Sequence, residues 1–191
     1  GNIFGTAIYP VTGQMIDIIL GAFGIFALLI TAFYAGDIVW RERSLELNEV
    51  QDTMPAPTWV LWASKGTALV LAVYASLVVA VLTTMLIQTA KGYTNFELGV
   101  YAKGVFFQIG LFLTLIALLS FLVQVYFNNK FVGFLGVLAW FVIVRILPAI
   151  DFEHRLYRFA SVPGGPYSDM NGFGHFAERM LVFNAYWLFA M

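Results

Sequence analysis

Four long apolar stretches constrain the fold of this chain more than any other feature. They lie at residues 18–36, 66–90, 104–129 and 131–150, and only the last contains a charged residue, Arg145. At about 1.5 Å of rise per residue, each helix could cross a hydrocarbon core about 30 Å thick. Backbone groups in that core find no water to bind, so such stretches must be helical. We therefore predict an all-α, polytopic membrane protein.

Composition supports this prediction and excludes several other classes of protein. Of 191 residues, 61% are hydrophobic and 11% are charged, whereas a soluble domain carries about 25% charged residues. Four such stretches in one short chain also argue against buried helices of a soluble protein. The net charge of −1 gives no reason to expect a nucleic-acid partner. Because the chain has no cysteine, thiolate zinc sites and cysteine nucleophiles are excluded.

The stretches predict one transmembrane domain over residues 1–191. Its complete spans are expected at about 15–36, 58–90, 104–129 and 131–150, with the start of a fifth at 177–191. Since the last apolar run is short of the roughly 20 residues that a membrane helix needs, we expect the chain to be an internal piece of a longer protein. The third connection is only residues 128–130, so the third and fourth spans are expected to be antiparallel neighbours.

The first connection, residues 37–57, differs from the others in its charge. It holds six charged residues between Arg41 and Asp52 and ends with Pro55 and Pro57. Residues 38–50 could form a short helix, although their apolar positions do not share one face. The prolines end it, because each lacks an N–H and restricts the preceding residue.

Several mostly polar motifs carry a family resemblance. They read DIVWRER at 37–43, NEV at 48–50, MPAPTWVL at 54–61, IQ at 87–88, KGY at 91–93, VYFNNK at 125–130, FEH at 152–154 and YSDMNGFGHF at 167–176. From about residue 36 onward the chain resembles the membrane domain of type-2 ABC exporters, specifically the large bacterial permeases fused to a zinc aminopeptidase-like domain.

The resemblance implies a multi-pass protein of the bacterial inner membrane, forming part of a six-span permease half. Its partners would be the lipid bilayer, an ATP-binding cassette ATPase subunit and a second permease half or dimer mate, with no cofactor. Residues 37–57 would be a cytoplasmic segment coupled to the ATPase through Trp40, Arg41, Glu42, Arg43, Glu46, Glu49, Pro55 and Pro57. Residues 151–178 would be an extracytoplasmic loop with a motif formed by Glu153, His154, Tyr167, Asp169, Asn171 and His175.

Two motifs of such systems do not occur in the sequence. There is no His-Glu-x-x-His helix and no Walker loop, so the chain alone is expected to have no enzymatic activity and no catalytic residue. Two rival functions remain open. The chain could be the membrane anchor of a zinc aminopeptidase fusion, or a helical scaffold within a larger complex.

The charges and the resemblance disagree about membrane orientation. Four Lys and Arg residues accompany the first and third connections, and six accompany the second and fourth. The positive-inside rule therefore mildly favours the second and fourth connections as cytoplasmic. The resemblance implies the reverse, and we give it more weight.

Polar residues within or beside the spans have two interpretations each. Lys65 could be a functional membrane lysine, but snorkelling to the interface is favoured. Gln88, Gln108 and Gln124 could line a substrate path, but hydrogen bonding between helices is favoured. His175 and Glu178 have ligand spacing, yet nothing brings the further ligands of a metal site to them, so none is predicted.

Overall fold

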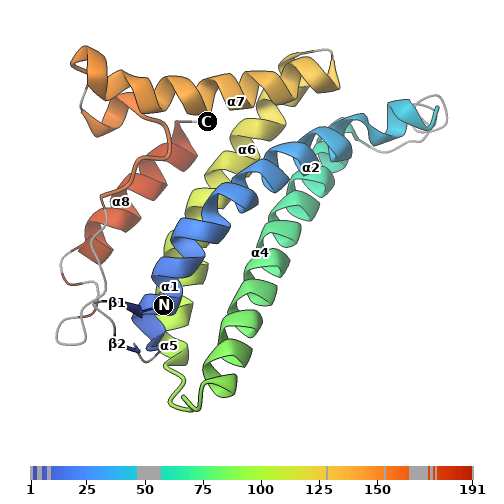
Figure 1. Ribbon diagram of the computed structural model, residues 1–191. Helices are drawn as coiled ribbons and strands as arrows, with labels where there is room; N and C mark the ends of the chain where they lie inside the picture. The colour runs from blue at the N-terminus through green and yellow to red at the C-terminus, as the bar shows by residue number, and fades with distance from the viewer. Residues whose placement is uncertain are drawn as a thin grey trace.

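Most of the residues that the structure describes are helical. The computed structural model describes residues 2–3, 6–7, 10–46, 57–127, 129–152, 154–163, 172, 174 and 176–190. Two strands of two residues, β1 (Asn2–Ile3) and β2 (Thr6–Ala7), pair antiparallel at the N-terminus, and all longer elements are helices (Figure 1). The predicted all-α fold is confirmed.

Two of the long helices are composite, because each contains a π-helical segment. The first comprises α1 (Thr12–Ile18), the π-helix η1 (Ile19–Phe23) and α2 (Gly24–Ser44). The second comprises α5 (Leu98–Tyr101), the π-helix η2 (Ala102–Ile109) and α6 (Gly110–Tyr126). The other helices are α4 (Thr58–Ala90), α7 (Lys130–Ile146), the 3₁₀ turns η3 (Leu147–Ile150) and η4 (Arg155–Tyr157), and α8 (Phe176–Phe189).

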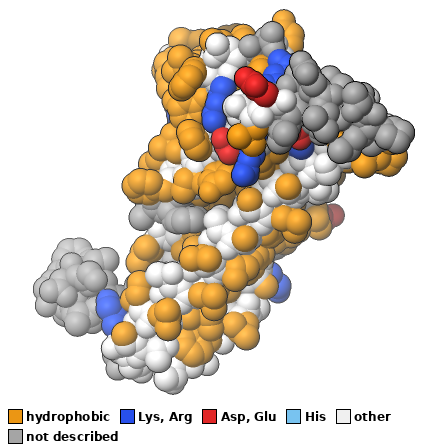
Figure 2. All heavy atoms as spheres, turned by 90° about the vertical axis from the view of Figure 1, so that its right-hand side faces the viewer, with side chains coloured by type: hydrophobic (Ala, Val, Ile, Leu, Met, Phe, Trp, Pro, Cys, Tyr) orange, Lys and Arg blue, Asp and Glu red, His pale blue; other side chains and the backbone are white. Residues whose placement is uncertain are grey.

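Within the described residues, four helical segments are long and apolar enough to cross a membrane. They are Gly24–Ser44, Thr58–Ala90, Leu98–Tyr126 and Lys130–Ile150. Large apolar side chains cover their outer surface, as along α4, where Leu71 and Leu86 are 69% and 71% exposed. Figure 2 shows hydrophobic side chains over most of the elongated body, with few charges along it. A water-facing surface would not tolerate such an apolar exterior, so the chain is a multi-pass membrane protein whose helices suit contact with lipid.

The core lies where α2, α4 and α6 pack side by side (Figure 1). Buried residues recur every four positions along α4, which places them on one helical face: Leu69, Val73, Leu77 and Val81. Small residues such as Ala32 and Ala35, both fully buried, line the facing side of α2 and let the backbones approach closely. Half of the α6 span is buried but only 11% of the α7 span, so α6 is central and α7 peripheral.

The expected antiparallel pairing of the third and fourth spans is wrong. Figure 1 shows α7 crossing the upper ends of α2 and α6 instead of returning alongside α6. The backbone is extended at Phe127 and Asn129, and the Asn129 side chain then caps α7 by accepting hydrogen bonds from the backbone N–H groups of Phe131 and Val132. Because extended residues separate α6 from α7, the axis of α7 need not follow that of α6. The shortness of this connection fixed only that α6 and α7 are in contact.

Candidate functional site

The candidate site forms where α2 continues beyond its apolar part. The sequence predicted a span ending near Gly36 and a separate helix over residues 38–50, but α2 runs unbroken to Ser44. Residues 47–56 lie outside the described residues. At 3.6 residues per turn, Asp37 and Trp40 point to one side of α2 while Glu42 points to another. The end of α2 therefore presents polar groups to several neighbouring helices at once.

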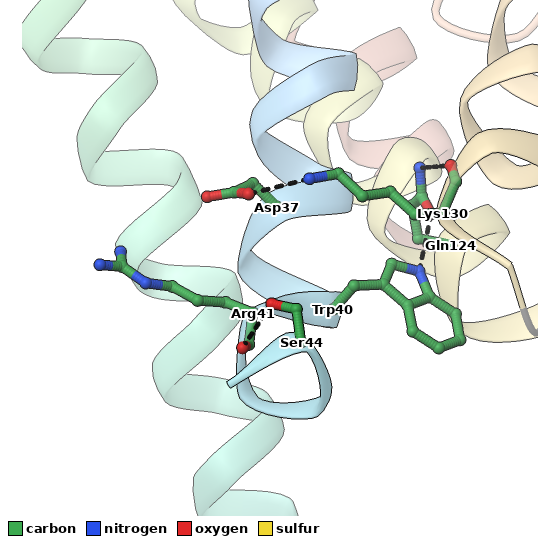
Figure 3. A network of polar contacts seen from close by, with 6 residues as sticks. All are labelled: Asp37, Trp40, Arg41, Ser44, Gln124 and Lys130. Atoms are coloured by element: carbon green, nitrogen blue, oxygen red, sulfur yellow. Dashed lines mark hydrogen bonds and ion pairs between the residues drawn. The ribbon is translucent and has the colours of Figure 1, made fainter. Parts of the chain in front are cut away.

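Gln124 of α6 is the centre of this arrangement. It is fully buried, and its Oε1 accepts a hydrogen bond of 3.0 Å from Trp40 Nε1. Its Nε2 lies 3.4 Å from the backbone oxygen of Lys130, at the start of α7 (Figure 3). One carboxamide thus connects α2, α6 and α7.

Two glycines leave the space that this carboxamide occupies. A Cβ atom added at Gly36 of α2 or at Gly133 of α7 would lie closer than 3.0 Å to the Gln124 side chain. Real Cβ contacts are almost never so short. A side chain at either position would therefore displace the Gln124 carboxamide from the place where its hydrogen bonds form.

Two ion pairs also hold this part of α2 to its neighbours. Lys130 Nζ lies 2.9 Å from Asp37 Oδ1, which connects α7 to α2 (Figure 3). Lys65 Nζ lies 2.5 Å from Glu42 Oε2, which connects α4 to α2. We call Asp37, Trp40, Glu42, Lys65, Gln124 and Lys130 the polar junction. It joins the end of α2 to three other helices.

Aromatic rings flank the cations at the same end of the molecule. Lys65 Nζ lies 5.5 Å from the centre of the Trp62 ring, and Lys130 Nζ lies 5.2 Å from that of Phe33. The Arg43 guanidinium lies 4.9 Å from the centre of the Trp40 ring. These distances are within the range of favourable cation–π contacts. The rings place apolar surface beside both lysine ammonium groups.

The structure brings together only some of the predicted coupling residues. Trp40 and Glu42 belong to the polar junction, and Arg43 stacks on Trp40. Arg41 and Glu46 are exposed, with Glu46 in a left-handed conformation just after the helix. Pro57 precedes α4 as its N-cap residue. Glu49 and Pro55 lie outside the described residues.

The predicted loop motif is mostly outside the part of the chain that the structure describes. This applies to Glu153, Tyr167, Asp169, Asn171 and His175. His154 is described, and its Nδ1 accepts a hydrogen bond of 3.3 Å from the Leu156 backbone N–H, so the imidazole caps η4. Among the described residues, no group of three or more His, Asp or Glu side chains is placed to hold a metal ion.

The glutamine predictions can be tested directly. Gln88 is fully buried, accepts a 2.8 Å hydrogen bond from the Tyr101 hydroxyl and donates one of 2.8 Å to the Pro10 carbonyl. Gln88 and Gln124 therefore bridge helices, as predicted. Lys65 reaches Glu42, a partner that the snorkelling prediction did not include. Asp37 and Lys130 were missed as a pair, because 93 residues separate them in the sequence.

No protein-family model, curated protein or solved structure matches this chain. The resemblance to exporter permeases therefore stays a prediction. What the geometry provides is a helix end, charged on its outer side and connected on its inner side to three other helices.

Proposed function

We propose that this chain is the membrane-spanning permease component of an ATP-driven ABC-type exporter of the bacterial inner membrane. In this proposal the end of α2 and the residues that follow it dock on a separate ATPase subunit. The chain itself hydrolyses neither ATP nor peptide bonds, and it works with a second permease half or dimer mate.

The polar junction is the observation that supports this proposal. A helix that receives force at its end must be rigid and must be connected to the helices that are to move. α2 is continuous to Ser44, and hydrogen bonds or ion pairs connect it to α4, α6 and α7. A displacement at Arg41 would therefore reach the whole bundle, whereas a helix fixed only by apolar contacts could slide past its neighbours.

The docking test reverses the outer charges of this segment. We expect full-length protein carrying R41E, R43E and E46K together to lose a Walker-motif ATPase that co-purifies with the wild type from native membranes. Like charges would then face each other across the interface, which weakens binding by several kcal/mol. The matched control is K91E with R155E, on connections that lie away from the charged end of α2. If no ATPase accompanies the wild-type protein, or if the triple variant retains it, the proposal is wrong.

The coupling test uses Trp40→Phe. This substitution removes the N–H that binds Gln124 and keeps an aromatic ring beside Arg43. We expect the variant to retain the ATPase in co-purification but to lose its stimulation by transported substrate. Loss of the ATPase itself would show that Trp40 contributes to docking instead. Unchanged stimulation would show that the polar junction does not transmit force.

A further inference from the structure

A cavity of about 360 Å³ lies between the helices, well away from the polar junction. It is lined by residues of η1 and α2, η2 and α6, the last part of α7, the segment 160–162 and α8. Phe112, on its wall, is the middle residue of the Leu98–Tyr126 span. The volume lies at the lower end of the range for small-molecule sites, about 300–1,000 Å³.

A second cavity of about 170 Å³ adjoins the first. The two share Phe112, Phe141, Arg145, Ala160 and Ser161 as lining residues, and the second adds Arg158. Two arginines therefore line this pair of neighbouring cavities.

The charge in this space is unbalanced. Arg145 lies 5.2 Å from the centre of the Phe141 ring, and the buried Nε of Arg158 has no hydrogen-bond partner. None of the described residues that line either cavity is acidic. Arg145 is exposed and Arg158 is half-buried. An anion that enters these cavities would therefore meet two arginines and no carboxylate.

A third polar group points to a ligand. Asn184 of α8 lines the larger cavity and is 6% exposed, and its Nδ2 donates a 2.8 Å hydrogen bond to the Met180 carbonyl. Its Oδ1 is buried and has no partner. Since a buried acceptor without a hydrogen bond is destabilising, this oxygen fits a hydroxyl or N–H close to the ligand's head group.

Most of the remaining wall is apolar, and it is partly open. Leu28, Ile109 and Leu113 line it, and a Cβ atom added at Gly24 would meet nothing within 4 Å. Both π-helical segments border the cavity, η1 through Leu20 and η2 through Gln108 and Ile109. Such segments re-aim side chains and are common at functional sites.

We propose that this space binds an anionic amphiphile with a single apolar chain. Arg145 and Arg158 hold its carboxylate or phosphate, because a planar guanidinium forms paired hydrogen bonds with such groups. The apolar chain lies against Leu28 and Phe112, and the small volume suits one chain rather than two. This site does not depend on the proposed transport function, and its test needs no ATPase.

The test measures labelling by a palmitate analogue that carries a diazirine on its chain. The full chain is reconstituted in phosphatidylcholine nanodiscs, and labelled peptides are mapped by mass spectrometry. We expect labelling near Leu28 and Phe112, saturating with probe concentration, and much weaker labelling by the corresponding uncharged alcohol. Equal labelling by the acid and the alcohol, or labelling confined to other parts of the chain, would overturn the proposal.

Charge and shape are then tested separately. R145Q and R158Q should each weaken binding about tenfold, the effect of losing one charge-assisted hydrogen bond, while R179Q, on α8 outside both cavities, should not. Gly24→Leu should block the chain subsite, whereas Gly21→Leu should not, since Gly21 also has open space but does not line the cavity. Unchanged affinity in both arginine variants would refute the role of charge, even if Gly24→Leu reduced binding. If an arginine variant misfolds, the two glycine variants decide whether the cavity binds the probe.

Two sources of the ligand can be distinguished in the same assay. Competition by phosphatidylglycerol in the nanodisc would identify a bilayer phospholipid chain as the occupant. Labelling unaffected by phosphatidylglycerol but reduced by free palmitate would identify a single-chain acid. Either result supports an anionic amphiphile, and failure of both competitors would contradict it.

Discussion

Two glutamines of the same composite helix lie in opposite surroundings. Gln124, near the end of α6, is fully buried, hydrogen-bonded and enclosed by glycines of two neighbouring helices. Gln108, in the π-helix η2, borders a cavity of about 360 Å³. Each has a basic residue of α7 nearby, but Lys130 has a carboxylate partner and Arg145 faces the cavity. Similar residue types thus form a closed connection in one region and an open site in the other.

The two regions differ in whether their polar groups are paired within the protein or are free to bind a ligand. In the polar junction each carboxamide or ammonium group is satisfied by the protein itself, and the helices are held at fixed positions. Around the cavity, Asn184 Oδ1 and Arg158 Nε are buried without partners. A membrane protein tolerates such groups where they serve binding. Substitutions should therefore affect stability in the first region and ligand binding in the second.

The largest contrast is expected from glycine substitutions. Gly133→Leu would push a side chain into the space of Gln124 and should lower the free energy of unfolding by about 1–3 kcal/mol, as overpacking does. Gly24→Leu enters open space, and replacing a helical glycine should change stability by less than about 1 kcal/mol, in the favourable direction. The measurement is the midpoint of unfolding in mixed micelles of mild detergent and dodecyl sulfate, followed by tryptophan fluorescence. Equal midpoints for the two variants would contradict the closed–open distinction.

A smaller contrast is expected between the glutamines themselves. Gln124→Leu removes the acceptor of the Trp40 N–H and should cost about 1–3 kcal/mol, the penalty for leaving a buried donor unpaired. Gln108→Leu, on the cavity wall, should change stability by less than about 0.5 kcal/mol. The same unfolding titration measures both. A double variant that combines Gln124→Leu with Trp40→Phe should recover part of the loss, because neither polar group then remains, and no recovery would show that the Trp40 hydrogen bond is not the cause.

The sequence predicted the helices and the bridging glutamines, which depend on local pattern. It did not predict the partners of those glutamines, which depend on how the helices cross. The absence of charge over residues 66–90 and 104–129 was enough to predict helices there, and glutamines within them predicted bridging, which Gln88 and Gln124 confirm. The partner of Gln124 was not predictable, because Trp40 is 84 residues away and meets it only through the packing of α2 on α6. The close approach of Gly133 to the Gln124 side chain depends on the same packing.

The cavity was missed for a related physical reason. From the sequence, Arg145 was only the one charged residue of the stretch 131–150, because its surroundings come from four other parts of the chain. The path of α7 across α2 and α6 decides whether that guanidinium meets lipid, water or protein. Nothing in the pattern of residues 131–150 encodes the direction of the helix axis. Even so, an arginine within an otherwise uncharged stretch was a signal that could have been pursued.

The smallest effect is expected from the ion pair between Asp37 and Lys130. Its side chains are 41% and 35% exposed, so water and salt screen the attraction. A double-mutant cycle with Asp37→Asn and Lys130→Met should give a coupling free energy of about 0.2–1 kcal/mol, decreasing as salt is added. Arg145 has no acidic partner among the described residues lining the cavities. The Arg145→Gln variant should therefore be as stable as the wild type, and its stability should not show the salt dependence of the ion pair.

A coupling free energy well above this range would show that the polar junction is drier than the exposed fractions imply. It would also mean that the ion pair, rather than Gln124, carries most of the connection between α2 and α7. A salt-dependent loss of stability in Arg145→Gln would instead place a counter-charge of the protein beside the cavity, and the two regions would then differ less than their geometry indicates.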